Sequence, residues 1–257
     1  MPKSLSQLLN ENTEREPCLI EPDILPFAGK GFFYGFAGIG KSFLMMQLMF
    51  EAANGLPWLG TFDVSRPVRV LYLQCELPEG KFRDRMRVMA GGYPDTPDEL
   101  VWTHTTRSMK IVPGDEEFGE LVRWMEQNKP ALWIIDPEYK VFRGDENQTK
   151  DVGPFVDLLD AVGERLNCAV MLVSHRRKKQ RDDMGQGVDR TFEEMPGSQR
   201  KSAWADMIMR MEKTQKGKRV VFEKTRYGEA PEEMWLTLDE RTMRHIAGHQ
   251  NQLEQAL

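Results

Sequence analysis

The hydrophobic positions of this chain follow two alternating periodicities from residue 31 onward. Short apolar runs, typical of buried strands, alternate with longer segments whose apolar residues recur every three to four positions, as on one face of a helix. This alternation predicts a mostly parallel sheet with crossover helices. The predicted strands are residues 32–34, 68–74, 101–105, 131–135 and 169–173, and the predicted helices are residues 42–53, 80–89, 116–128 and 152–166.

The pattern changes after residue 206, where strand-like segments follow one another with only short turns between them. Such spacing predicts an antiparallel meander. Its strands are residues 207–211, 219–223, 234–238 and 243–246. The predicted fold class is therefore α/β, a mostly parallel sheet with flanking helices that is extended by a C-terminal antiparallel β meander.

The first 25 residues form a separate region of the pattern. Leu5, Leu8 and Leu9 predict a short amphipathic helix over residues 4–9, and three prolines up to Pro26 predict extended chain after it. We therefore expect an N-terminal arm over residues 1–25, one main domain over residues 26–246 and a tail over residues 247–257.

Composition narrows the class of protein. The chain has 257 residues, 40% of them hydrophobic, and no apolar run near the ~20 residues of a membrane span. Its three cysteines are isolated, and its N-terminus lacks the apolar segment of a secretory signal. These features predict a cytoplasmic protein in a reducing compartment, without a membrane partner.

Charge is distributed unevenly. The formal net charge is −5, yet residues 171–230 hold 15 Lys and Arg against 9 Asp and Glu. A basic cluster on an acidic protein suits a polyanion such as nucleic acid, although a solvated surface loop would have the same composition. The densest cluster comprises Arg176, Arg177, Lys178, Lys179 and Arg181.

The strongest chemical signal is the motif G-x-x-x-x-G-K-S between the first predicted strand and the first predicted helix. Its glycines let successive backbone N–H groups point at phosphate oxygens, and the helix N-terminus adds partial positive charge. Lys41 is expected to reach the β- and γ-phosphates of ATP, and the Ser42 hydroxyl to bind Mg²⁺. The predicted nucleotide-binding residues are Gly35, Ala37, Gly38, Ile39, Gly40, Lys41, Ser42 and Phe43.

Acidic residues follow two further predicted strands. Asp136 comes directly after the apolar run 131–135, at the edge where open α/β sheets bind ligands, and is the second candidate magnesium ligand. Hydrolysis also needs a carboxylate that orients water. Glu76, at the end of the second strand, and Glu138, two residues after Asp136, both qualify, and spacing alone does not decide between them.

The order of these motifs resembles that of the RecA-like ATPases and, among them, the compact hexameric replicative helicases of the RepA type. The resemblance extends over residues 26–238. The Glu after the second strand, the His after the fifth strand and the late Lys-x-Arg are its most specific parts. The matching segments are residues 35–42, 71–76, 133–136, 142–147, 173–175, 197–206 and 224–228.

The resemblance implies a role for each matching residue. Glu76 would be the catalytic carboxylate, Asp136 would hold Mg²⁺ and His175 would sense the γ-phosphate. The cations of Lys224 and Arg226 would reach the nucleotide of a neighbouring copy, which implies a homo-oligomer in the form of a hexameric ring. Residues 140–150 and 176–190 would face its central channel and contact single-stranded DNA.

These observations lead to two main functional hypotheses. The first is a ring-forming ATPase that acts as a DNA helicase or single-strand translocase of a phage, plasmid or mobile element. The second is a RecA-like ATPase that acts as a nucleotide-dependent switch on protein partners, without unwinding. A small-molecule kinase is a weaker third, since it gives the late Lys-x-Arg no role.

Overall fold

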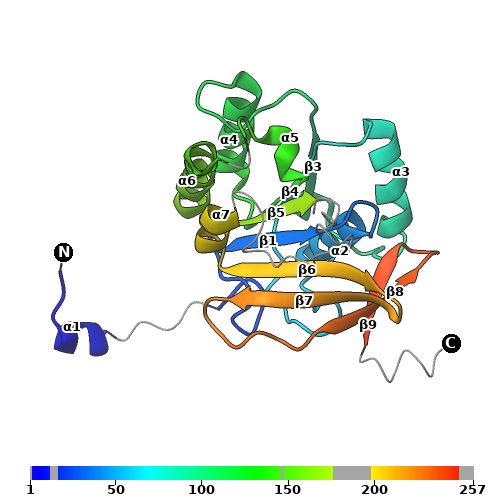
Figure 1. The fold of residues 1–257 in the computed structure, drawn as a ribbon, viewed down its shortest axis with the longest axis horizontal. Helices are drawn as coiled ribbons and strands as arrows, with labels where there is room; N and C mark the ends of the chain where they lie inside the picture. The colour runs from blue at the N-terminus through cyan, green and yellow to red at the C-terminus, as the bar shows by residue number, and fades with distance from the viewer. Residues whose placement is uncertain (1, 12–16, 146–147, 176–197, 249–257) are drawn as a thin grey trace, which may run out of the picture.

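The computed structural model describes residues 2–11, 17–145, 148–175 and 198–248. A nine-stranded sheet runs through the centre of the molecule in the order β3-β2-β4-β5-β1-β6-β7-β8-β9 (Figure 1). Its strands are β1 (Lys30–Gly35), β2 (Val70–Gln74), β3 (Val101–Thr105), β4 (Leu132–Asp136), β5 (Ala169–His175), β6 (Met207–Thr214), β7 (Gly217–Thr225), β8 (Met234–Asp239) and β9 (Arg244–Gly248).

Helices cover both faces of this sheet and make two apolar cores. One core holds α2 and α3, and the other holds α4, α5, α6 and α7, which lie together on one side of the sheet in Figure 1. Strands buried on both faces need apolar residues at every position, which is why β1, β2 and β4 are near-continuous hydrophobic runs. The helices are α1 (Leu5–Leu9), α2 (Lys41–Asn54), α3 (Glu79–Ala90), α4 (Glu116–Asn128), α5 (Glu138–Val141), α6 (Thr149–Leu166) and α7 (Ser198–Trp204).

The strand register places the ends of the sheet. Strands β1 to β6 pair in parallel, so their carboxyl ends meet at one edge. From β6 onward the pairing is antiparallel. The predicted α/β class with its antiparallel extension is confirmed, and each predicted strand and helix is present with ends shifted by a few residues.

The segment before β1 differs from the extended chain that its prolines predict. The backbone N–H groups of Ile24 and Leu25 both donate to the carbonyl of Ile20, which closes a tight turn. Leu19, Ile20, Ile24 and Leu25 are fully or almost fully buried in the core beside α2. The apolar residues between the prolines therefore pack as part of the domain, since exposing four such side chains would forfeit their burial energy.

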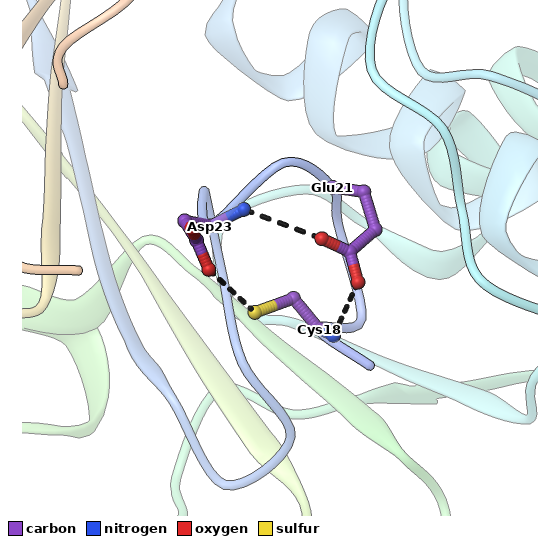
Figure 2. A group of neighbouring side chains, drawn as sticks. All are labelled: Cys18, Glu21 and Asp23. Carbon is purple, nitrogen blue, oxygen red and sulfur yellow. Dashed lines mark hydrogen bonds between the residues drawn. The ribbon is translucent and has the colours of Figure 1, made fainter. Parts of the chain in front are cut away.

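A carboxylate holds this turn from inside (Figure 2). Glu21 accepts hydrogen bonds from the backbone N–H groups of Cys18, at 2.6 Å, and Asp23, at 3.4 Å, while the Cys18 thiol lies 3.7 Å from an Asp23 oxygen. These three side chains lie together because they stabilise the turn through one another.

Strand β9 packs against α2. The Gln47 side chain on α2 accepts from the backbone N–H of His245 and donates to its carbonyl, at 2.7 and 3.0 Å. The His245 ring packs beneath Gly40, so that a Cβ on this glycine would come within 3.1 Å of the ring. The antiparallel extension therefore supports the loop between β1 and α2 from below.

None of the helices in the described part of the chain combines the length and the apolarity that crossing a membrane requires.

The buried His245 makes stability depend on pH. Burial, with a smaller effect from Lys218, lowers the pKa of His245 to about 4. Below pH 6.5 the unfolded chain binds a proton that the folded protein does not, so stability falls as the pH falls toward 4. Between pH 7 and pH 5 we expect the free energy of unfolding in urea to drop by about 2 kcal/mol through this residue.

The matched variant is His245→Leu, which keeps an apolar side chain at this position and cannot titrate. It should lose less stability than the parent over the same pH interval. Equal losses in the two proteins would contradict the assignment.

Candidate functional site

The loop between β1 and α2 has the backbone form of a phosphate-binding loop. Gly38 and Gly40 have φ angles of 75° and 114°, which residues with a side chain rarely adopt. The side chain of Lys41, the first residue of α2, curls back under the loop. Its ammonium group donates to the carbonyls of Gly35 and Phe36 at 2.8 and 2.9 Å.

The Lys41 ammonium is the electrostatic centre of the site. The residue is only 3% exposed, and burial lowers its pKa to about 8, while the carboxylates of Asp136 and Glu76 act in the opposite direction. Lys41 Nζ also lies 3.0 Å from Nδ1 of His175 at the end of β5. Its hydrogen-bond partners are two carbonyls and a ring nitrogen, none of them anionic, so this buried cation favours an anionic ligand.

Asp136 ends β4 beside the loop. Its carboxylate accepts hydrogen bonds from the Tyr72 hydroxyl and from the Ser42 side chain. Burial raises the pKa of Asp136, and these two hydrogen bonds oppose that shift. The two oxygen groups predicted to hold Mg²⁺, those of Ser42 and Asp136, are thus adjacent.

Glu76 lies just beyond β2, and the side chain of Gln74, two residues before it, holds its backbone. The Gln74 side chain accepts from the N–H groups of Glu76 and Leu77, at 2.5 and 2.6 Å, and donates to the Leu77 carbonyl. The Glu76 carboxylate is about half exposed and lies 3.6 Å from Nε2 of His175. The ring of His175 therefore bridges Lys41 and Glu76.

Glu138 occupies a different environment. It is 1% exposed, and a single oxygen accepts hydrogen bonds from Ser174 at 3.0 Å and Lys201 at 2.6 Å. This carboxylate is enclosed by protein, whereas that of Glu76 faces the cavity. The geometry thus favours Glu76 over Glu138 as the group that contacts water.

The cavity in front of the loop has a volume of about 290 Å³. Seven of the residues that line it are not among the predicted site residues, and three of these have polar side chains: Tyr72, Gln74 and Arg85. The Arg85 guanidinium lies over the ring of Phe43, 5.1 Å from its centroid. Arg85 belongs to no sequence motif, so only the folded structure identifies it as part of the site.

The cations of Lys224 and Arg226 lie at the other end of the sheet. Thr225 pairs with Met207 and Met207 with Gly31, which is four residues, or roughly 13 Å, from the end of β1 at Gly35. Both side chains donate to backbone carbonyls at the end of α7, including that of Ala205. They are therefore remote from the phosphate loop of their own chain.

The predicted DNA-contacting residues Arg176, Arg177, Lys178, Lys179 and Arg181 lie outside the described residues. The described chain stops at His175 and resumes at the start of α7.

The residues of the site fit a magnesium nucleotide. A Cβ on Gly38 would meet no other atom within 4 Å, so its backbone is open toward a ligand. The buried Lys41 supplies a cation for phosphate oxygens, and Ser42 and Asp136 supply the hard oxygen ligands that Mg²⁺ prefers.

Comparisons with known proteins identify the family of the chain. A family model described as an AAA domain matches residues 2–181. No curated protein sequence matches the chain.

Three solved structures are similar over most of the chain. The ATPase domain of G40P has a TM-score of 0.64 and 11% identity, over 86% of this chain and 85% of that one. A KaiC-like protein, PH0186 from Pyrococcus horikoshii OT3, has a TM-score of 0.59 and 11% identity, over 90% and 94%. A DnaB-like replicative helicase, solved in a study of its interactions with primase, has a TM-score of 0.61 and 12% identity, over 86% of this chain and 59% of that one.

The phosphate loop, the sheet order and these similarities lead to one conclusion. The chain belongs to the AAA domain family and has the fold of the RecA-like P-loop ATPases, a fold that it shares with replicative helicases.

Proposed function

We propose that this protein hydrolyses ATP in a ring of identical copies and couples the hydrolysis to single-stranded DNA, as a helicase or translocase of a phage, plasmid or mobile element. The observation that carries the proposal is the position of His175. Its ring touches Lys41 and Glu76 at the phosphate site, and the next residue in the sequence begins the basic cluster. One short segment thus joins the site of hydrolysis to a region suited to bind polyanions.

Each residue of the site then has a defined task. The loop and Lys41 bind the phosphates, and Ser42 and Asp136 would hold Mg²⁺, which would neutralise phosphate charge. Glu76 orients and polarises the attacking water from its exposed position beside the cavity. Burial, and then the nearby Lys41 ammonium, lower the pKa of His175, so its ring is neutral and Nδ1 can accept from Lys41.

A shared site explains the cations of Lys224 and Arg226. They lie too far from their own phosphate loop to contact a nucleotide bound there. Both lie beside the C-terminal end of α7, where they donate to the carbonyl of Ala205. In a ring, they would complete the phosphate site of the next copy. The similarity of the fold to that of a DnaB-like replicative helicase supports the proposal that copies of this chain assemble.

One observation favours the second candidate function, a nucleotide-dependent switch on protein partners. Helix α1 has no buried residue, and Leu5, Leu8 and Leu9 are 72%, 58% and 72% exposed. Three adjacent exposed leucines suit a protein surface rather than DNA. Binding of single-stranded DNA distinguishes the two functions.

The first test concerns the two carboxylates. Glu76→Gln should bind ATP normally and lose hydrolysis by at least about 10²-fold, because the amide keeps the shape but not the basicity of the carboxylate. Glu138→Gln is the matched control, and it should retain measurable hydrolysis. Turnover of ATP and binding of a non-hydrolysable analogue are measured for both variants, and the reverse result would assign the catalysis to Glu138.

The second test concerns DNA. Replacing Arg176, Arg177, Lys178 and Lys179 by Ala should weaken single-strand binding and flatten its dependence on salt by roughly 0.7 for each phosphate that the protein no longer neutralises. Binding is measured by fluorescence anisotropy at several salt concentrations. The control replaces Arg83 and Arg87, two exposed arginines of α3, by Ala. Unchanged affinity of the fourfold variant at every salt concentration would favour the switch on protein partners.

The third test concerns the shared site. Arg226→Ala should bind ATP but hydrolyse it slowly, since a cation supplied in trans contributes on the order of 10³–10⁵ in rate. Mixing this variant with Glu76→Gln should restore activity, because some interfaces then combine an intact Glu76 with an intact Arg226. ATPase activity is measured for each variant alone and across mixing ratios.

The shared site would be excluded if mixed oligomers form and no mixture exceeds the activity of the separate variants. It would also be excluded if the specific activity of the parent protein stays constant on dilution to the monomer.

A further inference from the structure

Glu138 connects two segments that are far apart in the sequence. One of its oxygens, Oε1, accepts from the Ser174 hydroxyl at the end of β5 and from the Lys201 ammonium on α7. The side chains of Glu138 and Lys201 are only 1% and 7% exposed. The Lys201 ammonium also lies 5.4 Å from the centroid of the Phe32 ring, which closes it off further.

The Ser174 side of this contact leads to the phosphate site. Ser174 precedes His175, whose Nδ1 lies 3.0 Å from Lys41 Nζ and whose Nε2 lies 3.6 Å from Glu76. Lys41 is the residue that a bound phosphate would engage. Because Ser174 is the residue next to His175, a change in the Lys41–His175 contact acts directly beside it.

Lys201 connects Glu138 to α7, whose C-terminal end contacts Lys224 and Arg226. Lys224 donates to the carbonyls of Ser202 and Ala205, at 2.7 and 2.6 Å, and Arg226 donates to that of Ala203 at 2.6 Å. Helix α7 is thus attached to Glu138 through Lys201, and to the Lys224 and Arg226 pair through its last carbonyls.

The bonding of Glu138 is uneven. Oε1 serves both donors, whereas Oε2 is buried and has no hydrogen-bond partner among the described residues. A buried oxygen without a partner is costly, so a shift of Ser174 or Lys201 that brought its donor to Oε2 would recover part of that cost. The carboxylate therefore offers two arrangements of the same donors.

We propose that Glu138 is a positioning residue that transmits the occupancy of the phosphate site to α7. Phosphate binding draws the Lys41 ammonium away from His175, the end of β5 adjusts, and the Ser174–Glu138–Lys201 bonds pass the change to α7. The inference rests on the proposed nucleotide binding but does not require DNA binding or a ring.

The test follows hydrogen exchange of the amides in residues 199–204 with and without a non-hydrolysable ATP analogue. In the parent protein, the analogue should slow their exchange about fivefold or more, the lower range of measured coupling between sites. In Lys201→Met, the analogue should still bind with similar affinity and protect the phosphate loop, while the protection of α7 is lost.

Two further variants separate transmission from a structural role. Glu138→Gln keeps an acceptor for Ser174 and removes the charge that holds Lys201, so its α7 response should also be lost. The double variant Glu138→Gln/Lys201→Met leaves no unpaired buried charge and should fold with near-parental stability, without restoring the response. Arg123→Met, which removes an exposed cation of α4, is the control and should respond as the parent does.

The inference is overturned if α7 of the parent shows no response although the analogue binds, or if Lys201→Met or the double variant responds as the parent does. A parent that fails to bind the analogue, as shown by an unprotected phosphate loop, would instead refute the proposed function and the inference with it.

Discussion

The buried ammonium group of Lys41 is the interaction around which the rest of the molecule is arranged. A cation at 3% exposure has to be surrounded by acceptors, and here the backbone supplies two carbonyls at the end of β1 while His175 supplies a third contact. The loop then turns into α2 at Gly40, which has a positive φ that residues with a side chain rarely adopt. An anionic ligand would compete with these neutral acceptors for the same ammonium.

Sheet direction separates the chemistry of the protein into two ends. The carboxyl ends of β1, β4 and β5 bring the phosphate loop, Asp136 and His175 to one edge. The return of the chain through antiparallel β7 leaves Lys224 at the opposite edge. The phosphate site and the cation pair therefore lie too far apart to touch within one copy of the chain.

The sequence was sufficient for the elements and the phosphate loop because both follow from local patterns. The periodicity of Phe118, Leu121 and Met125 determines α4, and the glycine spacing determines the loop. It was insufficient wherever a residue takes its role from a distant partner. The choice between Glu76 and Glu138 depends on Lys201, 63 residues beyond Glu138, and the burial of His245 depends on Gln47, 198 residues before it. The turn held by Glu21 was not predicted, because the prolines around it favour extended chain and the apolar residues between them are too few to show a periodicity.

The place of β1 in the sheet has a consequence for synthesis of the protein. This strand is made before both of its neighbours, β5 and β6, because Lys30 pairs with Val170 and Gly31 pairs with Met207. Until then both edges of an apolar strand are unpaired on a growing chain, and such edges invite association with other chains. Pairings this distant in sequence also slow folding. The centre of the sheet is therefore completed only once β6 has been made, and until then the growing chain exposes an apolar strand that is prone to aggregation.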